Sequence, residues 1–151
     1  MQRWIALAVV VVLLLLAAGG AFYARRTYYE NSPAPMWVPI EIKADRPPEE
    51  VDRVVKELKT KLSEDEVLGK VVQDLNLAKA WNFSGEMPAV AELRKRLFVK
   101  VGEMDSQLGK VPAIHVGVRG KSKERDLSGK IAIRLMEDVS RILGMKPRAT
   151  N

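Results

Sequence analysis

The chain has 151 residues, a formal net charge of +6, 47% hydrophobic residues and no cysteine. This length allows one domain of modest size beside a membrane segment, and the lack of cysteine excludes a disulfide framework within it. The charge is uneven, because residues 91–151 contain 14 basic and 7 acidic side chains. Their scattered placement without interleaved aromatics argues against nucleic-acid binding. It leaves two alternatives, an anionic lipid or polymer as a partner and ordinary solvated helix faces.

The run from Trp4 to Ala24 contains 21 consecutive uncharged residues and has basic residues on both sides. As a helix it would extend about 31 Å, which is close to the thickness of the hydrocarbon core of a bilayer. We therefore predict a transmembrane anchor over residues 1–26. A cleaved secretory signal is the alternative, since Ala17-Ala18-Gly19 has the small residues of a cleavage site, but the apolar run is long for a signal sequence.

The orientation of this anchor does not follow from charge alone, because Arg3 lies on one side and Arg25 and Arg26 lie on the other. A first helix that only three residues precede commonly acts as a signal-anchor and exports the chain that follows it. We therefore expect a single-pass protein of the bacterial inner membrane whose domain lies in the periplasm.

Residues 27–35 are predicted to be a spacer, because Pro33 and Pro35 interrupt the anchor helix there. From Met36 to Lys43 apolar and polar residues alternate, which predicts a strand, and Pro39 favours a place at the edge of a sheet. The next element is a helix that begins at Pro47-Pro48 and keeps a period of 3.6 residues as far as Leu62.

The segment from Ser63 to Glu66 has the sequence of a capping box. In such a box the Ser63 hydroxyl accepts a hydrogen bond from the Glu66 amide, and the Glu66 carboxylate accepts one from the Ser63 amide. A second helix should therefore begin at Glu64. A third helix is predicted to begin at Pro88, where proline suits the first turn.

The remaining predicted elements are a short strand over residues 98–101, a polar connection over 102–110, a strand over 114–118 and a helix from Leu127 to Leu143 that stops at Gly144. The fold class is therefore α/β (mixed α+β), with an N-terminal transmembrane helix followed by a small sheet of about three strands packed by about four helices. The domain would cover residues 36–144, with a disordered tail at 145–151.

The segment Gly117 to Ser122 ends in Gly-Lys-Ser, but His115 occupies the position where a phosphate-binding loop needs its first glycine. His115 is also the only histidine, which excludes a two-histidine metal site, and its place on the polar side of a strand predicts an exposed side chain. We therefore expect no catalytic, cofactor-binding or metal-binding residues and no enzyme activity.

The candidate functional residues are instead contact residues. An exposed aromatic on an edge strand and a basic turn are both typical of surfaces that bind partners. The candidates are Trp37 and Glu41 on the outer face of the first strand, and Arg119, Lys121 and Lys123 on the basic turn.

The stretch Leu62–Leu77, followed by Trp81, resembles a segment of the Wzz-type polysaccharide chain-length determinants, also called polysaccharide co-polymerases. That segment reads as a Ser, a Val-Leu pair, a Val and then Leu-x-Leu. Ala89–Val99 is similar to the helix of this family that leads into a strand. Ala113–Val118 and the following Leu127–Ala132 are similar to its next strand and helix.

The resemblance implies a membrane-proximal periplasmic domain that is not an enzyme. Members of the family form rings in the inner membrane and usually continue through a long helix to a second transmembrane segment, which residues 1–151 do not contain. The resemblance also implies a role in envelope polysaccharide biosynthesis, such as that of lipopolysaccharide, in chain-length regulation or export. We expect the domain to act there through oligomeric contacts, either with copies of itself or with other polysaccharide-assembly proteins. The alternative function is a single-pass adaptor that binds a partner protein or an anionic envelope polymer as a monomer.

Overall fold

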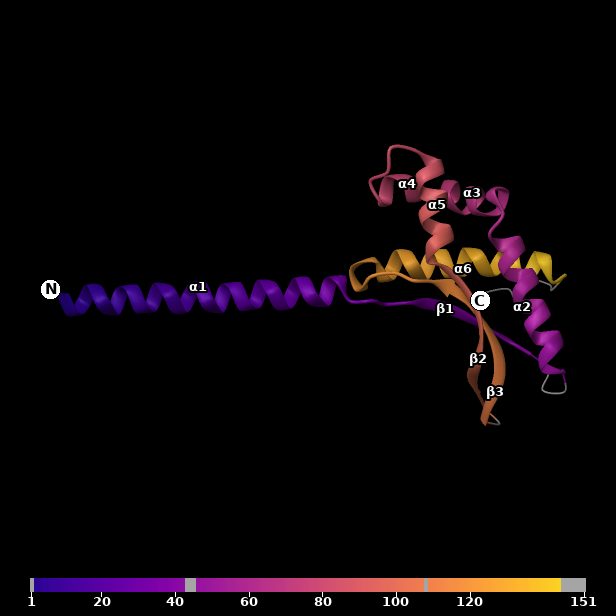
Figure 1. The fold of residues 1–151 in the computed structure, drawn as a ribbon, viewed down its shortest axis with the longest axis horizontal. Coiled ribbons are helices and arrows are strands. Elements are labelled where there is room, and N and C mark those ends of the chain that lie inside the picture. Colours follow the sequence, from indigo (N-terminus) through magenta and orange to yellow (C-terminus); the bar gives the residue numbers. More distant parts are fainter. Residues whose placement is uncertain (1, 43–45, 108, 145–151) are drawn as a thin grey trace.

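A computed structural model describes the backbone of residues 2–42, 46–107 and 109–144, and the side chains of these ranges at residue 16 and from residue 18 onward. The predicted tail at 145–151 lies outside these ranges. A long helix leads into a mixed domain of strands and helices (Figure 1). The elements are α1 (Gln2–Asn31), β1 (Met36–Glu41), α2 (Pro48–Leu62), α3 (Asp65–Asp74), α4 (Leu77–Ala80), α5 (Glu86–Arg96), β2 (Leu97–Ser106), β3 (Gly109–Val118), the 3₁₀ helix η1 (Ser122–Glu124) and α6 (Arg125–Ile142).

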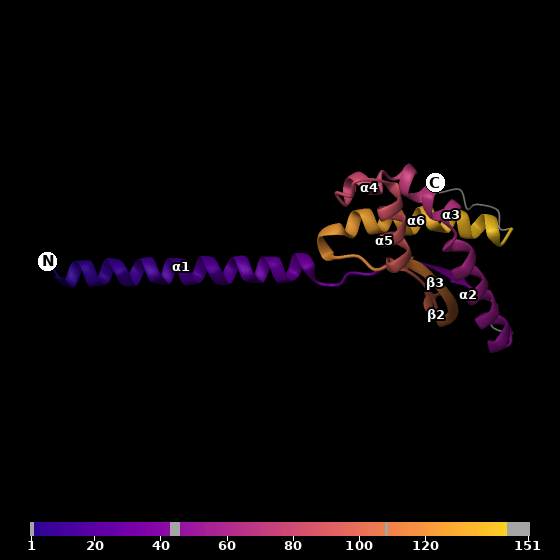
Figure 2. The ribbon, with the colours of Figure 1, turned by 45° about the horizontal axis from the view of Figure 1, so that its top comes forward.

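Helix α1 extends away from the rest of the molecule in both ribbon views (Figures 1 and 2). Its backbone is helical from Gln2 to the end of the predicted anchor at residue 26, and the helix continues to Asn31. Of the helices in the part of the chain whose side chains are described, none is long and apolar enough to cross a membrane. Residues 1–15, which hold more than half of the predicted span, lie outside that part, and the anchor stays a prediction.

The predicted spacer at 27–35 begins later than expected, because α1 continues to Asn31, and the residues that follow are held by hydrogen bonds. The Ala34 amide donates to the Gly120 carbonyl at 2.8 Å, and the Ser122 amide donates to the Ser32 carbonyl at 3.0 Å. The hydroxyls of Ser32 and Ser122 lie 2.8 Å apart, and Pro33 forms an isolated antiparallel β-bridge with Lys121. The end of α1 is therefore fixed against the turn between β3 and α6.

The sheet has three antiparallel strands in the order β1-β3-β2, so β1 lies at an edge as predicted. The prediction of a short strand at 98–101 and a polar connection at 102–110 was incomplete, because β2 and β3 form one hairpin whose pairing reaches Ser106 and Gly109. Pairs such as Asp105 with Lys110 lie beyond the core. Both faces of the hairpin are exposed to solvent there, so the sequence of this part lacks the alternation of apolar and polar residues that predicts a strand.

Helices α2 and α6 pack on one face of the sheet, and this confirms the mixed α+β class and the sheet of three strands. In the two ribbon views α3, α4 and α5 lie beyond α6 as a further helical group (Figures 1 and 2). The core joins apolar residues of all these parts. Its largest fully buried side chains include Leu58 and Leu62 of α2, Leu68 of α3, Leu77 of α4, Leu93 of α5, Val116 and Val118 of β3, and Ile131, Leu135 and Val139 of α6.

The predicted capping box at Ser63 was wrong. Ser63 is the C-terminal cap of α2 with helical backbone angles, and its hydroxyl donates to the Lys59 carbonyl at 2.6 Å. The N-terminal cap of α3 is Glu64, which makes no capping hydrogen bond with its side chain, and Glu66 pairs with Lys70 instead. The physical reason is that Ser63 completes the last turn of α2, which leaves its hydroxyl beside a carbonyl of its own turn.

The predicted break between α2 and α3 is confirmed, since α3 begins one residue after the expected position. Helix α5 begins at Glu86, two residues before the predicted start at Pro88. Proline is tolerated at this third position because the first four amides of a helix have no partner within it.

Candidate contact surface

The sheet face opposite α2 and α6 carries no helix within the ranges that the structure describes. Along β1 the side chains alternate between the core and solvent, with Ile40 buried and Trp37 and Glu41 exposed. Because paired residues of antiparallel strands share a face, the register defines which residues lie beside Trp37. We call this surface the outer face, and it consists of Trp37, Pro39 and Glu41 on β1, Ala113, His115 and Gly117 on β3, and Phe98, Lys100 and Gly102 on β2.

Four of these side chains form a contiguous group across the three strands. The rings of Trp37 and His115 are stacked with their centroids 5.7 Å apart and their planes 19° apart. The ammonium of Lys100 lies 5.7 Å from the ring centres of both Trp37 and Phe98, within the range of a cation–π contact. Trp37 remains 43% exposed, so this group presents an aromatic surface that the stacked His115 ring supports from the sheet side.

The prediction that His115 is exposed was wrong, because its side chain is only 8% exposed. Its Nε2 lies 3.0 Å from the Glu103 carbonyl oxygen and its Nδ1 has no hydrogen-bond partner. The ring lies over Gly102, where an added Cβ would come within 2.5 Å of the imidazole. The cause of burial is therefore non-local: His115 lies on the central strand, and Trp37 from one neighbour and the Gly102 backbone from the other enclose it.

The free edge of β1 is a poor template for a further strand. The amides of Ala34 and Ile42 both donate toward the β3 side, to Gly120 and Pro112, so the even-numbered residues between them direct their amides inward. Pro39 then stands at an outward position, where its missing N–H interrupts the row of donors. Such a proline protects an edge from strand addition, so a contact made by β1 must use the outer face.

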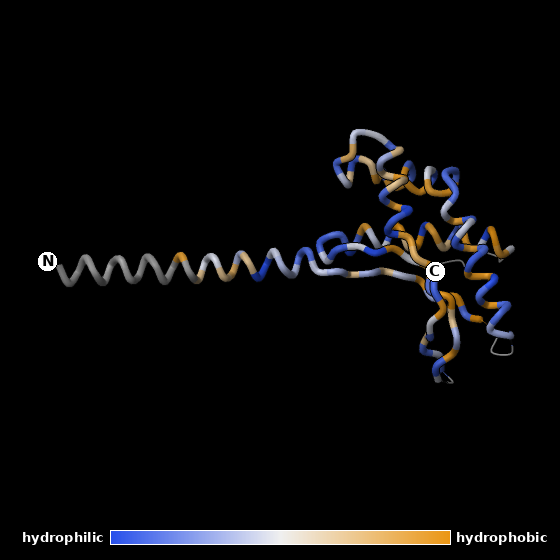
Figure 3. Tube along the Cα trace, in the orientation of Figure 1, coloured by the Kyte–Doolittle hydropathy of each residue, from blue (hydrophilic) through white to orange (hydrophobic). Residues whose placement is uncertain are grey.

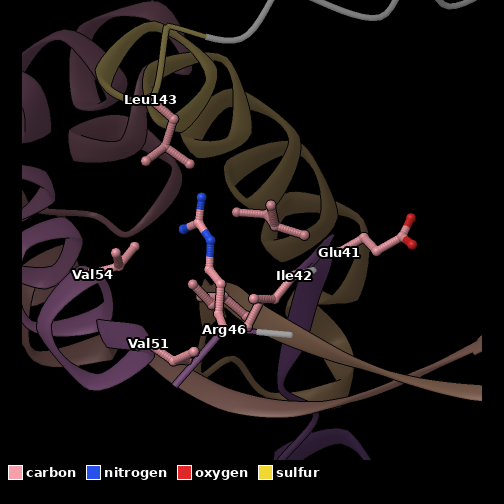
Figure 4. A pocket seen from close by; sticks show the side chains of 8 residues that line it. Glu41, Ile42, Arg46, Val51, Val54 and Leu143 are labelled. Atoms are coloured by element: carbon pink, nitrogen blue, oxygen red, sulfur yellow. The ribbon is translucent and has the colours of Figure 1, made fainter. Parts of the chain in front are cut away.

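Glu41 is exposed but lies far from Trp37. It pairs with Ala113 at the end of β1 distant from α1, about 13 Å from Trp37 along the strand. A cavity of about 290 Å³ opens beside it, with apolar walls that include Val51, Val54 and Leu143. Figure 4 shows the Arg46 side chain among these apolar residues and the Glu41 carboxylate directed away from them.

The basic turn lies at the opposite end of the sheet. Arg119, Lys121 and Lys123 are all exposed and follow β3, in the turn that is hydrogen-bonded to the end of α1. Because Met36 pairs with Val118, Trp37 and Arg119 lie at the same end of the sheet. Hydrophilic residues gather in this turn beside the end of α1 (Figure 3). The structure therefore places Trp37 at the same end as the turn and separates both from Glu41.

An ion pair to α5 fixes the position of this turn. Arg96 donates to Glu124 of η1 at 2.8 Å and to Glu92 at 2.8 Å, and its guanidinium lies 4.6 Å from the centre of the Trp81 ring. Burial alone would lower the pKa of Arg96, but the hydrogen bonds to the two carboxylates outweigh it and raise that pKa above its ordinary value. Trp81 is therefore a packing residue.

Sequence reasoning missed Phe98, Lys100 and the buried His115 as parts of the outer face. Their alternation within a strand could be read from the sequence, but nothing local indicates that β2 and β1 flank β3. Within the described ranges, no three acidic or histidine side chains lie together in a way that could hold a metal ion. The outer face presents aromatic rings and charged side chains, which suit it to binding a partner.

No family model, no curated protein and no solved structure matches this chain.

Proposed function

We propose that the chain is a membrane-anchored, non-catalytic domain of the bacterial inner membrane, held in the periplasm, that acts through contacts between copies. The observation that carries this proposal is the open outer face, on which half-exposed Trp37 stacks on buried His115. Aromatic side chains on an uncovered surface are frequent at the centre of protein–protein contacts.

The process in which the contacts operate is envelope polysaccharide biosynthesis, chain-length regulation or export. The similarity to Wzz-type proteins supports this part of the proposal. The similar segments fall on α3, on α5 where it leads into β2, and on β3 with α6. These elements belong to one domain that shares a single core.

A second copy is the partner that the charges of the outer face favour. The face carries a cation, Lys100, and an anion, Glu41, on opposite edge strands. In a two-fold symmetric contact each copy contributes the same surface, so Lys100 of one copy can approach Glu41 of the other while the two Trp37 rings are covered. Strand addition at β1 is disfavoured by Pro39, which makes a face-to-face contact the better geometry.

The test is the oligomeric state of the full-length chain in uncharged detergent and in membranes after cross-linking. Truncating a central aromatic commonly costs 2 kcal/mol or more, so Trp37→Ala should weaken association by roughly thirtyfold. Ile133→Ala is the matched control, since Ile133 is an apolar side chain on α6 that is 62% exposed and lies off the outer face. A chain that is monomeric in both media, or equal losses in the two variants, would refute association through this face.

The role in polysaccharide assembly is tested separately, by the length distribution of the envelope polysaccharide in a strain that lacks the chain. An altered distribution that the wild-type chain restores, and Trp37→Ala does not, supports the proposal.

The second candidate is the single-pass adaptor, and the exposed basic turn beside α1 favours it. A monomeric chain together with a normal polysaccharide length distribution would replace the first function with this one.

A further inference from the structure

A second cavity, of about 390 Å³, lies at the end of the sheet next to α1. Its walls come from α2, β2, the segment after α1 and the turn after β3. Three cationic side chains line it, Lys59, Lys100 and Arg119, together with apolar walls that include Phe98, Pro33 and Pro35, and no acidic residue takes part. We call this cavity the basic pocket.

The three cations of the basic pocket have no anionic partner among the described residues. Neighbouring cations do: Lys61 pairs with a carboxylate of its own helix, and Arg96 pairs with two. Like charges that share one cavity repel each other, and this cost is relieved when an anion enters between them. The pocket therefore has the charge of an anion site, and the Phe98 ring beneath Lys100 supplies an apolar wall.

The place of the pocket relative to the predicted anchor suggests which anion it meets. From Ala24, the last residue of the apolar run, to Asn31, the last residue of α1, the helix rises about 10 Å. The headgroup layer of a leaflet is roughly 5–7 Å thick. The small remaining gap is one that flexible lysine and arginine side chains can bridge.

We propose that the basic pocket binds the phosphate-bearing headgroup of an anionic lipid from the membrane in which α1 is anchored. The Arg119 guanidinium has the planar geometry that recognises a phosphate with two hydrogen bonds, and the lysine ammoniums act as point charges beside it. This inference rests on the anchoring in the proposed function. It does not depend on association between copies.

The experiment is isothermal titration of the full-length chain in uncharged detergent with short-chain phosphatidylglycerol. Short-chain phosphatidylcholine, which has no net charge, and inorganic phosphate are titrated in parallel. We expect phosphatidylglycerol to bind most tightly, and added salt to weaken the binding.

The variants separate the pocket from the general charge of the protein. Lys59→Gln with Arg119→Gln should weaken phosphatidylglycerol binding roughly 25-fold, at about fivefold for each cation removed near an anionic headgroup. The control, Lys95→Gln with Lys130→Gln, removes two exposed charges that do not line the pocket and should change binding less than twofold. Lys59→Arg keeps the charge at that position and leaves the Arg119 guanidinium in place, so it should retain most of the binding. Arg119→Lys keeps the charge but removes the planar donor pair, and it should weaken the binding.

Three results would overturn the inference. Equal losses in the pocket variant and the control would show that a diffuse field attracts the lipid. Equal affinity for phosphatidylglycerol and phosphatidylcholine would exclude recognition of an anionic headgroup. Inorganic phosphate that binds as tightly and displaces the lipid would identify a free anion as the ligand.

Carbonate extraction of native membranes tests the membrane anchoring separately from lipid binding. A chain that carbonate releases contradicts the anchor and therefore the lipid as the natural source, whatever the titration shows. A chain that stays in the membrane but binds no phosphatidylglycerol contradicts only the pocket.

Discussion

The substitution Gly102→Ala tests how the outer face is built. A Cβ at Gly102 would lie 2.5 Å from Cε1 and 2.8 Å from Nδ1 of His115, which is closer than such atoms approach each other in proteins. The imidazole must therefore move, and it can do so only by disturbing its stack with Trp37 and its hydrogen bond to the Glu103 carbonyl. Overpacking of this kind costs about 1–3 kcal/mol of unfolding free energy.

A double-mutant cycle with His115→Ala isolates the clash. His115→Ala alone should cost about 1–3 kcal/mol, because it removes one hydrogen bond and one aromatic stack. In the double variant the added methyl group enters space that the imidazole has left, and alanine is slightly better than glycine in a strand. The double variant should therefore be more stable than the sum of the two single changes predicts, by about 1.5–3 kcal/mol.

The assay is urea unfolding of the full-length chain in uncharged detergent, followed by tryptophan fluorescence. Trp37 is a reporter on the outer face, because its stacking partner is displaced in Gly102→Ala and removed in His115→Ala. Gly69→Ala is the control, since a Cβ there meets nothing within 4 Å and α3 gains a better helix former. Additive effects of Gly102→Ala and His115→Ala, within about 0.3 kcal/mol, would refute the packing described for His115.

Two further predictions concern the helices. Ser63→Ala and the matched change Thr60→Ala should each lower the free energy of unfolding by less than about 0.5 kcal/mol, because each hydroxyl only donates to a carbonyl of its own helix. A loss above about 1 kcal/mol for Ser63→Ala in urea unfolding would indicate that Ser63 caps α3 after all. Asp138→Ala should cost about 2–3 kcal/mol in the same assay, because this carboxylate is 5% exposed and accepts hydrogen bonds from Arg134 at 2.9 Å and from Arg141 at 3.2 Å. This cost is smaller than the usual cost of breaking a buried ion pair, because Arg134 keeps its ion pair with Asp74. A loss of unfolding free energy under about 0.5 kcal/mol would contradict the prediction.

The predictable parts of the fold are those that local periodicity specifies. The alternation from Met36 and the 3.6-residue period before Leu62 each depend on a single buried face, so β1 and α2 could be read from the sequence. The outer half of the hairpin was missed for the converse reason. Residues such as Glu103 become a strand through pairing with β3 alone, and neither of their faces is buried in the core.

The candidate surfaces were predictable only in part, because each gathers residues from distant parts of the chain. Trp37 could be singled out as an exposed aromatic on an edge strand. The burial of His115 could not, since it requires Trp37 on one neighbouring strand and a glycine on the other. Likewise Lys59 and Arg119 are 60 residues apart, and only the fold brings them to one cavity.

The hydrogen bonds between the end of α1 and the turn before α6 couple the rotation of the helix about its axis to that of the domain. Since an α-helix advances about 100° per residue, each residue gained or lost near the end of α1 would swing Trp37 around the helix axis by that angle. With α1 anchored as we propose, the distance of the domain from the membrane would change by only about 1.5 Å. In that arrangement the length of α1 sets the direction in the membrane plane toward which the outer face points, and so which neighbour it can contact.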